Sequence, residues 1–158
     1  MYYLEHESIA YTSRSGRTYT IYGSPVCLLQ APCVRRGLIL FQQSARLHRS
    51  RGAFQYLAGH GHDIYARIPS STDILMTHTP PEGICDTTKR GERGGCADLR
   101  RRLEHRDLGR CRLHVYGHIH EARKVAVVDK TERNPSGRVS ANAAMPNFPL
   151  PVIVDLLD

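Results

Sequence analysis

The stretch "LHVYGHIHEAR", residues 113–123, says most about how this chain folds and what it holds. Apolar and polar side chains alternate over 112–116, which predicts a short β-strand. The strand runs into Gly117, and His118 and His120 follow with one residue between them. Because alternate side chains of an extended chain point to the same side, we expect both imidazoles to share one side. We expect Gly117 to supply the bend that aims them.

A second apolar run, Ile74 to Thr77, ends in a similar way. It is short enough for a buried strand, and His78 follows it directly, at the start of a rigid loop containing two prolines. The carboxyl ends of parallel strands meet at one edge of a sheet, where ligands gather. We therefore expect His78, His118 and His120 to converge there, since neutral imidazole is a common ligand of Zn, Mn or Fe.

The remaining chain predicts a mixed α/β domain. Tyr, Thr and Ile dominate 8–12 and 17–22 around a Ser-Gly turn, which favours a β-hairpin. Cys96, Leu99 and Leu103 recur at helical spacing. Weaker patterns predict strands over 38–41, 124–128, 139–143 and 152–156, a weak helix over 44–58 and a turn over 131–137.

Charge divides the chain unevenly. The sequence has 158 residues, about one domain, and a formal net charge of +7. No Asp or Glu occurs from Ser8 to His62, and the arginines of that stretch match the whole net charge. They are Arg14, Arg17, Arg35, Arg36, Arg46, Arg49 and Arg51. We expect one partial domain over 1–158, with 26–62 a divergent acid-free loop or poorly ordered segment.

Several other residues resemble site residues but have a more ordinary interpretation. "GHGHD", residues 59–63, repeats the Gly-His-x-His spacing, yet no apolar strand precedes it, and its glycines favour a mobile loop. Cys85 and Cys96 are too far apart for a short zinc knuckle, so we expect core thiols. The five cysteines form no Cys-x-x-Cys pair and are expected to be reduced. No signal peptide or apolar run of membrane-spanning length is visible, so a cytoplasmic location without membrane contact is expected.

A family resemblance joins these motifs. The chain contains, in order, "GSP" (23–25), "IPSSTDILMTHTPPEG" (68–83), "GGC" (94–96), "RLHVYGHIHEAR" (112–123), "NA" (142–143) and "PVIVDL" (151–156). Together these segments resemble the calcineurin-like metallophosphoesterases, and more narrowly their MPPED-like branch. The combination of strand-Thr-His-x-Pro-Pro with strand-Gly-His-Ile-His-Glu is specific, whereas Gly-His-x-His alone would be weak.

The resemblance implies a fold and a chemistry. The fold would be α/β: a calcineurin-like β-sandwich flanked by helices, with two divalent metals at the carboxyl ends of the central strands. His78 and His118 would ligate one metal and His120 the other. The metals would act as Lewis acids on a phosphoester and generate the attacking hydroxide. His114 and Glu121 match family positions near the site that are not ligands.

The sequence departs from the family in its first half. It has no Asp-x-His, no Gly-Asp and no Asn-His pair, and these motifs supply the family's remaining ligands, its bridging aspartate and the histidine that protonates the leaving group. The resemblance therefore covers only the carboxyl-terminal half of the four-layer αββα domain. Two cations need carboxylates to offset their repulsion, so we expect at most one weakly held ion, with water or Asp86 completing its shell. Phosphodiesterase activity should be weak or absent.

Three hypotheses follow. The chain is a metallophosphoesterase-family sequence without its amino-terminal half, a degenerate module that binds a metal and a phosphoester small molecule or nucleotide, or a nucleic-acid binder using Arg35 to Arg51. The third is the least favoured, because that stretch contains one aromatic residue, Phe41, for stacking. Half a sandwich would also expose a sheet face, so self-association is expected.

Overall fold

The computed structural model describes residues 2–29, 54–57, 59–145 and 150–156. Most strands fall where the sequence pattern predicts them. Strands β1 (Glu7–Thr12) and β2 (Thr18–Ser24) form the predicted hairpin. The two histidine-bearing strands are β5 (Ile74–Thr77) and β6 (Leu113–Tyr116). Strands β7 (Lys124–Val128) and β8 (Arg138–Asn142) follow, with a tight turn at 131–137 between them.

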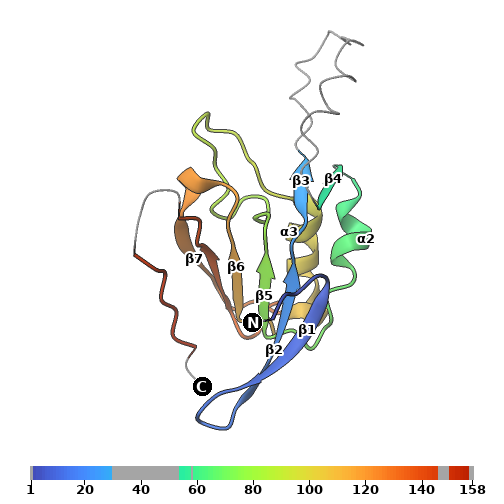
Figure 1. Ribbon diagram of the computed structural model, residues 1–158, viewed down its shortest axis with the longest axis vertical. Coiled ribbons are helices and arrows are strands. Elements are labelled where there is room, and N and C mark those ends of the chain that lie inside the picture. The colour runs from blue at the N-terminus through green and yellow to red at the C-terminus, as the bar shows by residue number, and fades with distance from the viewer. Residues whose placement is uncertain (1, 30–53, 58, 146–149, 157–158) are drawn as a thin grey trace.

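These strands form one six-stranded sheet in the order β1-β2-β5-β6-β8-β7 (Figure 1). The four central strands, β2, β5, β6 and β8, are mutually parallel, and the two outer strands are antiparallel to their neighbours. Strands β3 (Cys27–Leu29) and β4 (Gln55–Leu57) make a separate parallel pair. The carboxyl ends of β2, β5 and β6 therefore lie side by side at one edge of the large sheet.

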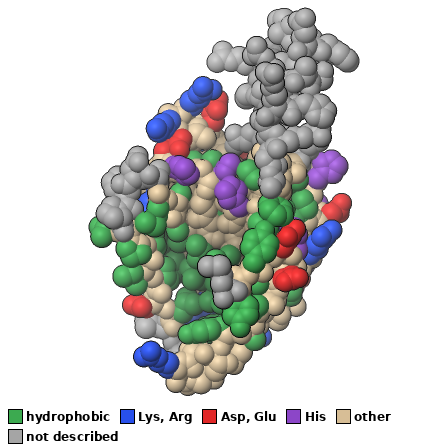
Figure 2. Space-filling model, in the orientation of Figure 1, with side chains coloured by type: hydrophobic (Ala, Val, Ile, Leu, Met, Phe, Trp, Pro, Cys, Tyr) green, Lys and Arg blue, Asp and Glu red, His purple; other side chains and the backbone are tan. Residues whose placement is uncertain are grey.

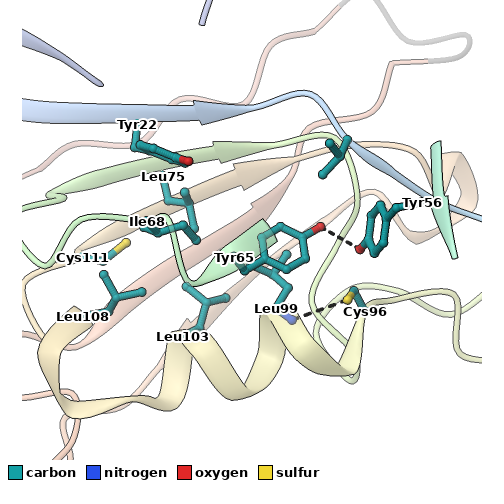
Figure 3. Close-up of a cluster of buried hydrophobic side chains, with 11 residues drawn as sticks. Tyr22, Tyr56, Tyr65, Ile68, Leu75, Cys96, Leu99, Leu103, Leu108 and Cys111 are labelled. Atoms are coloured by element: carbon teal, nitrogen blue, oxygen red, sulfur yellow. Dashed lines mark hydrogen bonds between the residues drawn. The ribbon is translucent and has the colours of Figure 1, made fainter. Parts of the chain in front are cut away.

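Helix α3 (Ala97–Glu104) covers one face of this sheet (Figure 3). Its buried side chains, Leu99 and Leu103, have the predicted helical spacing, and Cys96 caps the helix by accepting a hydrogen bond from Leu99 N. A short 3₁₀ turn, η1 (Arg106–Leu108), continues it. The core between helix and sheet comprises Tyr22, Val26, Tyr56, Tyr65, Ile68, Leu75, Cys96, Leu99, Leu103, Leu108 and Cys111.

The opposite face of the sheet is apolar and partly exposed, with Leu4 packed against Gly23 at the β2 side of it. Tyr22 and Leu75 point toward α3, so the residues that alternate with them point away from it. Within the described ranges, no helix or strand covers this side, and Figure 2 shows apolar side chains gathered on it. The predicted exposed sheet face is thus present. Its members are Ile21, Ile74, Met76, Leu113, Val115, Val125, Val127 and Val139.

Several predictions fail in particular places. The "GHGHD" segment is not a loop: it opens helix α2 (Gly61–Tyr65), which packs against α3 through Gly61. Residues 55–57 of the expected weak helix form strand β4. The expected strand at 152–156 has no regular structure and no partner strand, and Ile153 there is 82% exposed. The pattern at 38–41, residues 44–53 and Arg35 to Arg51 lie outside the described residues.

None of the helices in the described ranges is both long and apolar enough to cross a membrane.

Candidate metal centre

The edge where β2, β5 and β6 end is tied together by its backbone. His78 N donates to Ser24 O at 3.2 Å, and Gly117 N donates to His78 O at 3.2 Å. Parallel pairing therefore continues one residue beyond each strand. Because of these two bonds, the backbone at His78 is fixed between the ends of the two neighbouring strands, which gives its side chain a defined position.

His78 and His118 come together at this edge, as the sequence predicts. His78 Nε2 lies 3.0 Å from His118 Nδ1, and the ring centroids are 4.8 Å apart. One nitrogen donates its proton and the other accepts it. If the donor ring carries its proton on its other nitrogen instead, both facing nitrogens present lone pairs to the same small volume. Two imidazoles in this arrangement can bind one divalent ion in place of the shared proton.

The bend that aims this pair is at His118 and not at Gly117, which corrects the prediction. His118 adopts φ 66°, and Gly117 is not among the residues with positive φ. Histidine is one of the few side chains that enters this left-handed region with some frequency. The turn also breaks the extended geometry assumed for the His-x-His pair, so the two imidazoles do not project together.

His120 begins a 3₁₀ turn, η2 (His120–Ala122), and is exposed. It lies close enough to lower the pKa of both His78 and His118 by its charge. Its ring nitrogens, however, are not part of the group of donor atoms that lie within 4.8 Å of one another. The structure thus brings two of the three predicted histidines together and leaves the third at the margin.

The third member of that group is Cys27, the first residue of β3. Its Sγ lies 3.8 Å from His118 Nδ1 and 3.9 Å from His118 Nε2. Sequence reasoning missed Cys27, because it treated the cysteines as ordinary thiols. A usable pattern was present: Cys27 follows the Gly-Ser-Pro that ends β2, the third strand to reach this edge.

The electrostatics of the cluster keep its donors neutral. Burial, followed by the charges of the neighbouring histidines, lowers the pKa of both His78 and His118, so both rings are uncharged at neutral pH. Burial raises the pKa of the Cys27 thiol, so the free thiol is protonated. Metal binding at this edge would therefore release a thiol proton, and its affinity would fall as the pH falls.

Two neighbouring residues have structural roles. His114 is fully buried, and its Nε2 donates to Thr77 Oγ1 at 2.8 Å, because that hydroxyl already donates to Thr79 O. Burial holds the pKa of His114 well below its usual value, which keeps the ring neutral. Glu121 accepts a hydrogen bond from Lys89 N at 2.8 Å. Neither residue belongs to the donor cluster.

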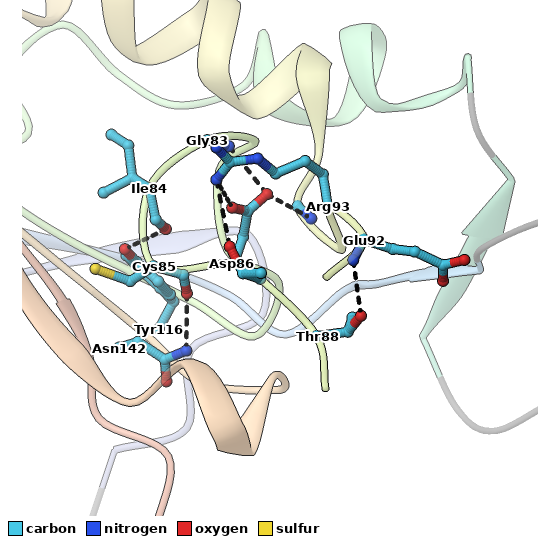
Figure 4. A network of polar contacts seen from close by, with 11 residues as sticks. Gly83, Ile84, Cys85, Asp86, Thr88, Glu92, Arg93, Tyr116 and Asn142 are labelled. Carbon is cyan, nitrogen blue, oxygen red and sulfur yellow. Dashed lines mark hydrogen bonds and ion pairs between the residues drawn. The ribbon is translucent and has the colours of Figure 1, made fainter. Parts of the chain in front are cut away.

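Asp86 is not available to a metal, contrary to expectation. Its carboxylate is fully buried and accepts from Gly83 N at 2.9 Å, from Gly95 N at 3.1 Å and from Arg93 Nη1 at 2.8 Å (Figure 4). These bonds hold the loop between β5 and α3 closed on itself. The cysteines that flank this loop also differ, since Cys96 is a core thiol as predicted and Cys85 is only half-buried.

Comparisons with known proteins found relatives that match part of this chain. The chain is 39% identical over 90 residues to metallophosphoesterase domain-containing protein 1 of Homo sapiens and of Mus musculus, covering 56% of this chain and 26% of each relative. It is 46% identical over 59 residues to a UPF0046 protein of Caenorhabditis elegans, covering 37% of this chain and 14% of that relative.

The chain thus spans about a quarter or less of the length of these curated relatives. No family profile matches it. The relatives, the mixed α/β sheet with few helices and the histidines at its carboxyl edge agree with one another. These partial similarities support the resemblance of the chain to the MPPED-like branch of the calcineurin-like metallophosphoesterases, over the carboxyl-terminal half of their domain.

Proposed function

We propose that this chain holds a single divalent metal ion on His78 and His118, with His120 beside them as an optional further ligand, and that its own hydrolysis of phosphodiesters is weak or absent. The observation that carries the proposal is the 3.0 Å approach of His78 and His118 from the ends of two adjacent parallel strands. Both rings are neutral, which is the protonation state that binds metal.

The donor set explains why activity should be low. In the family, a bound metal pair polarises the phosphoester and supplies a hydroxide at neutral pH. The sequence has no Asp-x-His, Gly-Asp or Asn-His pair, and the described residues place no carboxylate in the donor cluster. Three imidazoles carry no negative charge with which to hold two adjacent cations. What these residues can do is bind one ion and, through it, an oxygen of a phosphate-bearing ligand.

A phosphodiesterase assay tests the activity half of the proposal. The full chain would be incubated with manganese or zinc and bis(p-nitrophenyl) phosphate, beside His118→Ala and with His62→Ala as a control on an exposed histidine of α2. We expect the same near-background rate for all three proteins. Turnover that His118→Ala abolishes and His62→Ala leaves intact would contradict the claim of weak activity.

A further inference from the structure

We propose that the Cys27 thiolate is a further protein ligand of this ion, so that the site is a Cys-His-His zinc site. This inference rests on the proposed metal site and adds to it a residue from a different strand and a choice of metal. Cys27 is the described cysteine whose sulfur lies beside histidine nitrogens, since it forms the donor cluster with His78 and His118.

The distances suit a tetrahedral zinc ion. Zinc binds nitrogen at about 2.0 Å and sulfur at about 2.3 Å, so two nitrogen ligands lie about 3.3 Å apart and a nitrogen and a sulfur about 3.6 Å apart. The corresponding separations here are 3.0 Å between His78 and His118, and 3.8 Å from the Cys27 sulfur to His118 Nδ1. These two separations agree with the zinc values to within a few tenths of an ångström, and the Cys27 sulfur lies within 4.8 Å of the His78 nitrogen, so binding the ion requires the sulfur to move toward His78.

The backbone on both sides of Cys27 is locked to the residue after His78. Thr79 is fully buried, and its hydroxyl accepts from Leu28 N at 3.0 Å and donates to Val26 O at 3.2 Å. A single side chain thus holds the residues before and after Cys27. This arrangement fixes the cysteine relative to His78 before any metal arrives, as a preformed ligand requires.

An ordinary packing role explains Cys27 less well. The buried thiols Cys96 and Cys111 belong to the apolar core, whereas Cys27 is only half-buried and does not. Among the described residues, the polar partners of its sulfur besides the histidine are Leu28 O, at a long 3.8 Å, and the Thr79 side chain. A half-buried thiol beside two neutral imidazoles is therefore better explained as a ligand than as a core residue.

The proposal includes one chemical step. On binding, the Cys27 S–H bond breaks, its proton passes to solvent, and a metal–sulfur bond replaces a metal–water bond. No oxidant or reductant is involved. A thiolate ligand favours zinc and cobalt over manganese and magnesium, which prefer oxygen ligands. The remaining coordination position stays open to water, to His120 or to a phosphate oxygen.

Cobalt substitution in the full chain tests this proposal. Cobalt bound to a thiolate gives a near-ultraviolet charge-transfer absorption that nitrogen and oxygen ligands do not give. We expect this band in the wild-type chain and in Cys85→Ser, a matched change at the other half-buried cysteine of the described residues, and its loss in Cys27→Ser. The zinc affinity of Cys27→Ser should fall about 100-fold. This is roughly the loss expected when one of four ligands, and its part of the binding free energy, is removed from a structural zinc site.

The outcomes separate this proposal from the proposed function. One bound cobalt without the thiolate band, with equal affinity in Cys27→Ser, would overturn the role of Cys27 and leave the histidine site intact. A folded chain that binds no cobalt or zinc would overturn both. Should Cys27→Ser not fold, alkylation of the wild-type chain gives the answer: zinc should protect Cys27 and not Cys85, and equal alkylation with and without zinc would refute the proposal.

Discussion

Two segments of this protein share the Gly-His-x-His spacing, at residues 59–62 and 117–120, and the structure uses them differently. The first opens helix α2, and both of its histidines are exposed. The second follows strand β6, and its first histidine lies 3.0 Å from His78. The spacing is the same, but only one segment lies at an edge where other strands end.

The difference shows that the place of the preceding strand, rather than the motif itself, decides which neighbours a histidine meets. Strand β4 precedes the first segment but belongs to the separate two-stranded sheet, whereas β6 lies beside β5 in the large sheet. Backbone hydrogen bonds from His78 N to Ser24 O and from Gly117 N to His78 O place the second segment next to other possible metal ligands. The first segment is held by its glycine instead, because Gly61 packs against Asp98 of α3. The following predictions test this contrast, beginning with the largest expected effect.

Exchanging one histidine in each segment for alanine should affect metal binding very differently. We expect His118→Ala to lower zinc affinity by about 100-fold or more, because it removes one ligand of the cluster. His62→Ala should leave the affinity unchanged. Competition with a chromophoric chelator measures both affinities. Similar losses in the two variants would mean that the histidines bind zinc non-specifically.

Replacing a glycine of each segment with alanine should affect stability in the opposite order, with the larger loss in the first segment. A Cβ on Gly61 would lie 2.7 Å from Asp98 Oδ2 and 2.9 Å from Asp98 Cβ, whereas one on Gly117 would meet nothing closer than 3.9 Å. Gly61→Ala should therefore lower the free energy of unfolding by about 1–3 kcal/mol, and Gly117→Ala by less than about 0.5 kcal/mol. Urea unfolding provides the comparison, and equal losses would refute the packing role of Gly61.

The strand beneath the second segment should make stability depend on pH through His114. Its pKa is lowered in the folded protein, so below pH 6.5 the unfolded chain takes up a proton that the folded chain refuses. Stability should be complete above pH 6.5 and fall by up to about 1.4 kcal/mol per pH unit below it for this one group.

The variant His114→Gln isolates this contribution. In this variant the unfolding free energy should decline less steeply below pH 6.5. Part of the decline should remain, because the pKa values of His78 and His118 are also lowered in the folded protein. Denaturant unfolding at several pH values, without added metal, gives the slope of unfolding free energy against pH for the wild-type chain and for the variant. An unchanged slope would show that His114 takes up its proton equally in the folded and unfolded chain, which would contradict the lowered pKa.

The smallest expected effect concerns the open side of the sheet that carries His78 and His118. We propose that this apolar face supports self-association of the chain. Met76 is 48% exposed on it, so Met76→Lys should reduce concentration-dependent association and alter unfolding free energy by no more than about 0.5 kcal/mol. Sedimentation velocity measures the association. A wild-type chain that stays monomeric at high concentration would contradict the proposal.

Strands and the main helix could be predicted from the sequence because their patterns are local. The short apolar run and the apolar–polar alternation predicted β5 and β6, and the spacing of Leu99 and Leu103 predicted α3. The convergence of His78 and His118 also followed, since parallel strands end at one edge. Predicting these features requires only the hydrophobic period of each element and the rule that the carboxyl ends of parallel strands lie at one edge of the sheet.

The misses depend on contacts between distant parts of the chain. Helix α2 is stabilised by the fit of Gly61 against Asp98, which no local pattern reveals. Cys27 reaches the histidines because Thr79, 52 positions along the numbering, binds the backbone around it. Nothing in the sequence indicates that Asp86 has partners, but two backbone N–H groups and Arg93 donate hydrogen bonds to its carboxylate.

Nuclear magnetic resonance of the histidine rings during a zinc titration tests the central claim most directly. Long-range proton–nitrogen correlations report each ring separately in the wild-type chain. We predict that His78 and His118 change their ring-nitrogen shifts and saturate at one equivalent of zinc, while His60, His62 and His114 do not. Unchanged His78 and His118 signals in a folded chain, or equal changes in His60 and His62, would contradict the account.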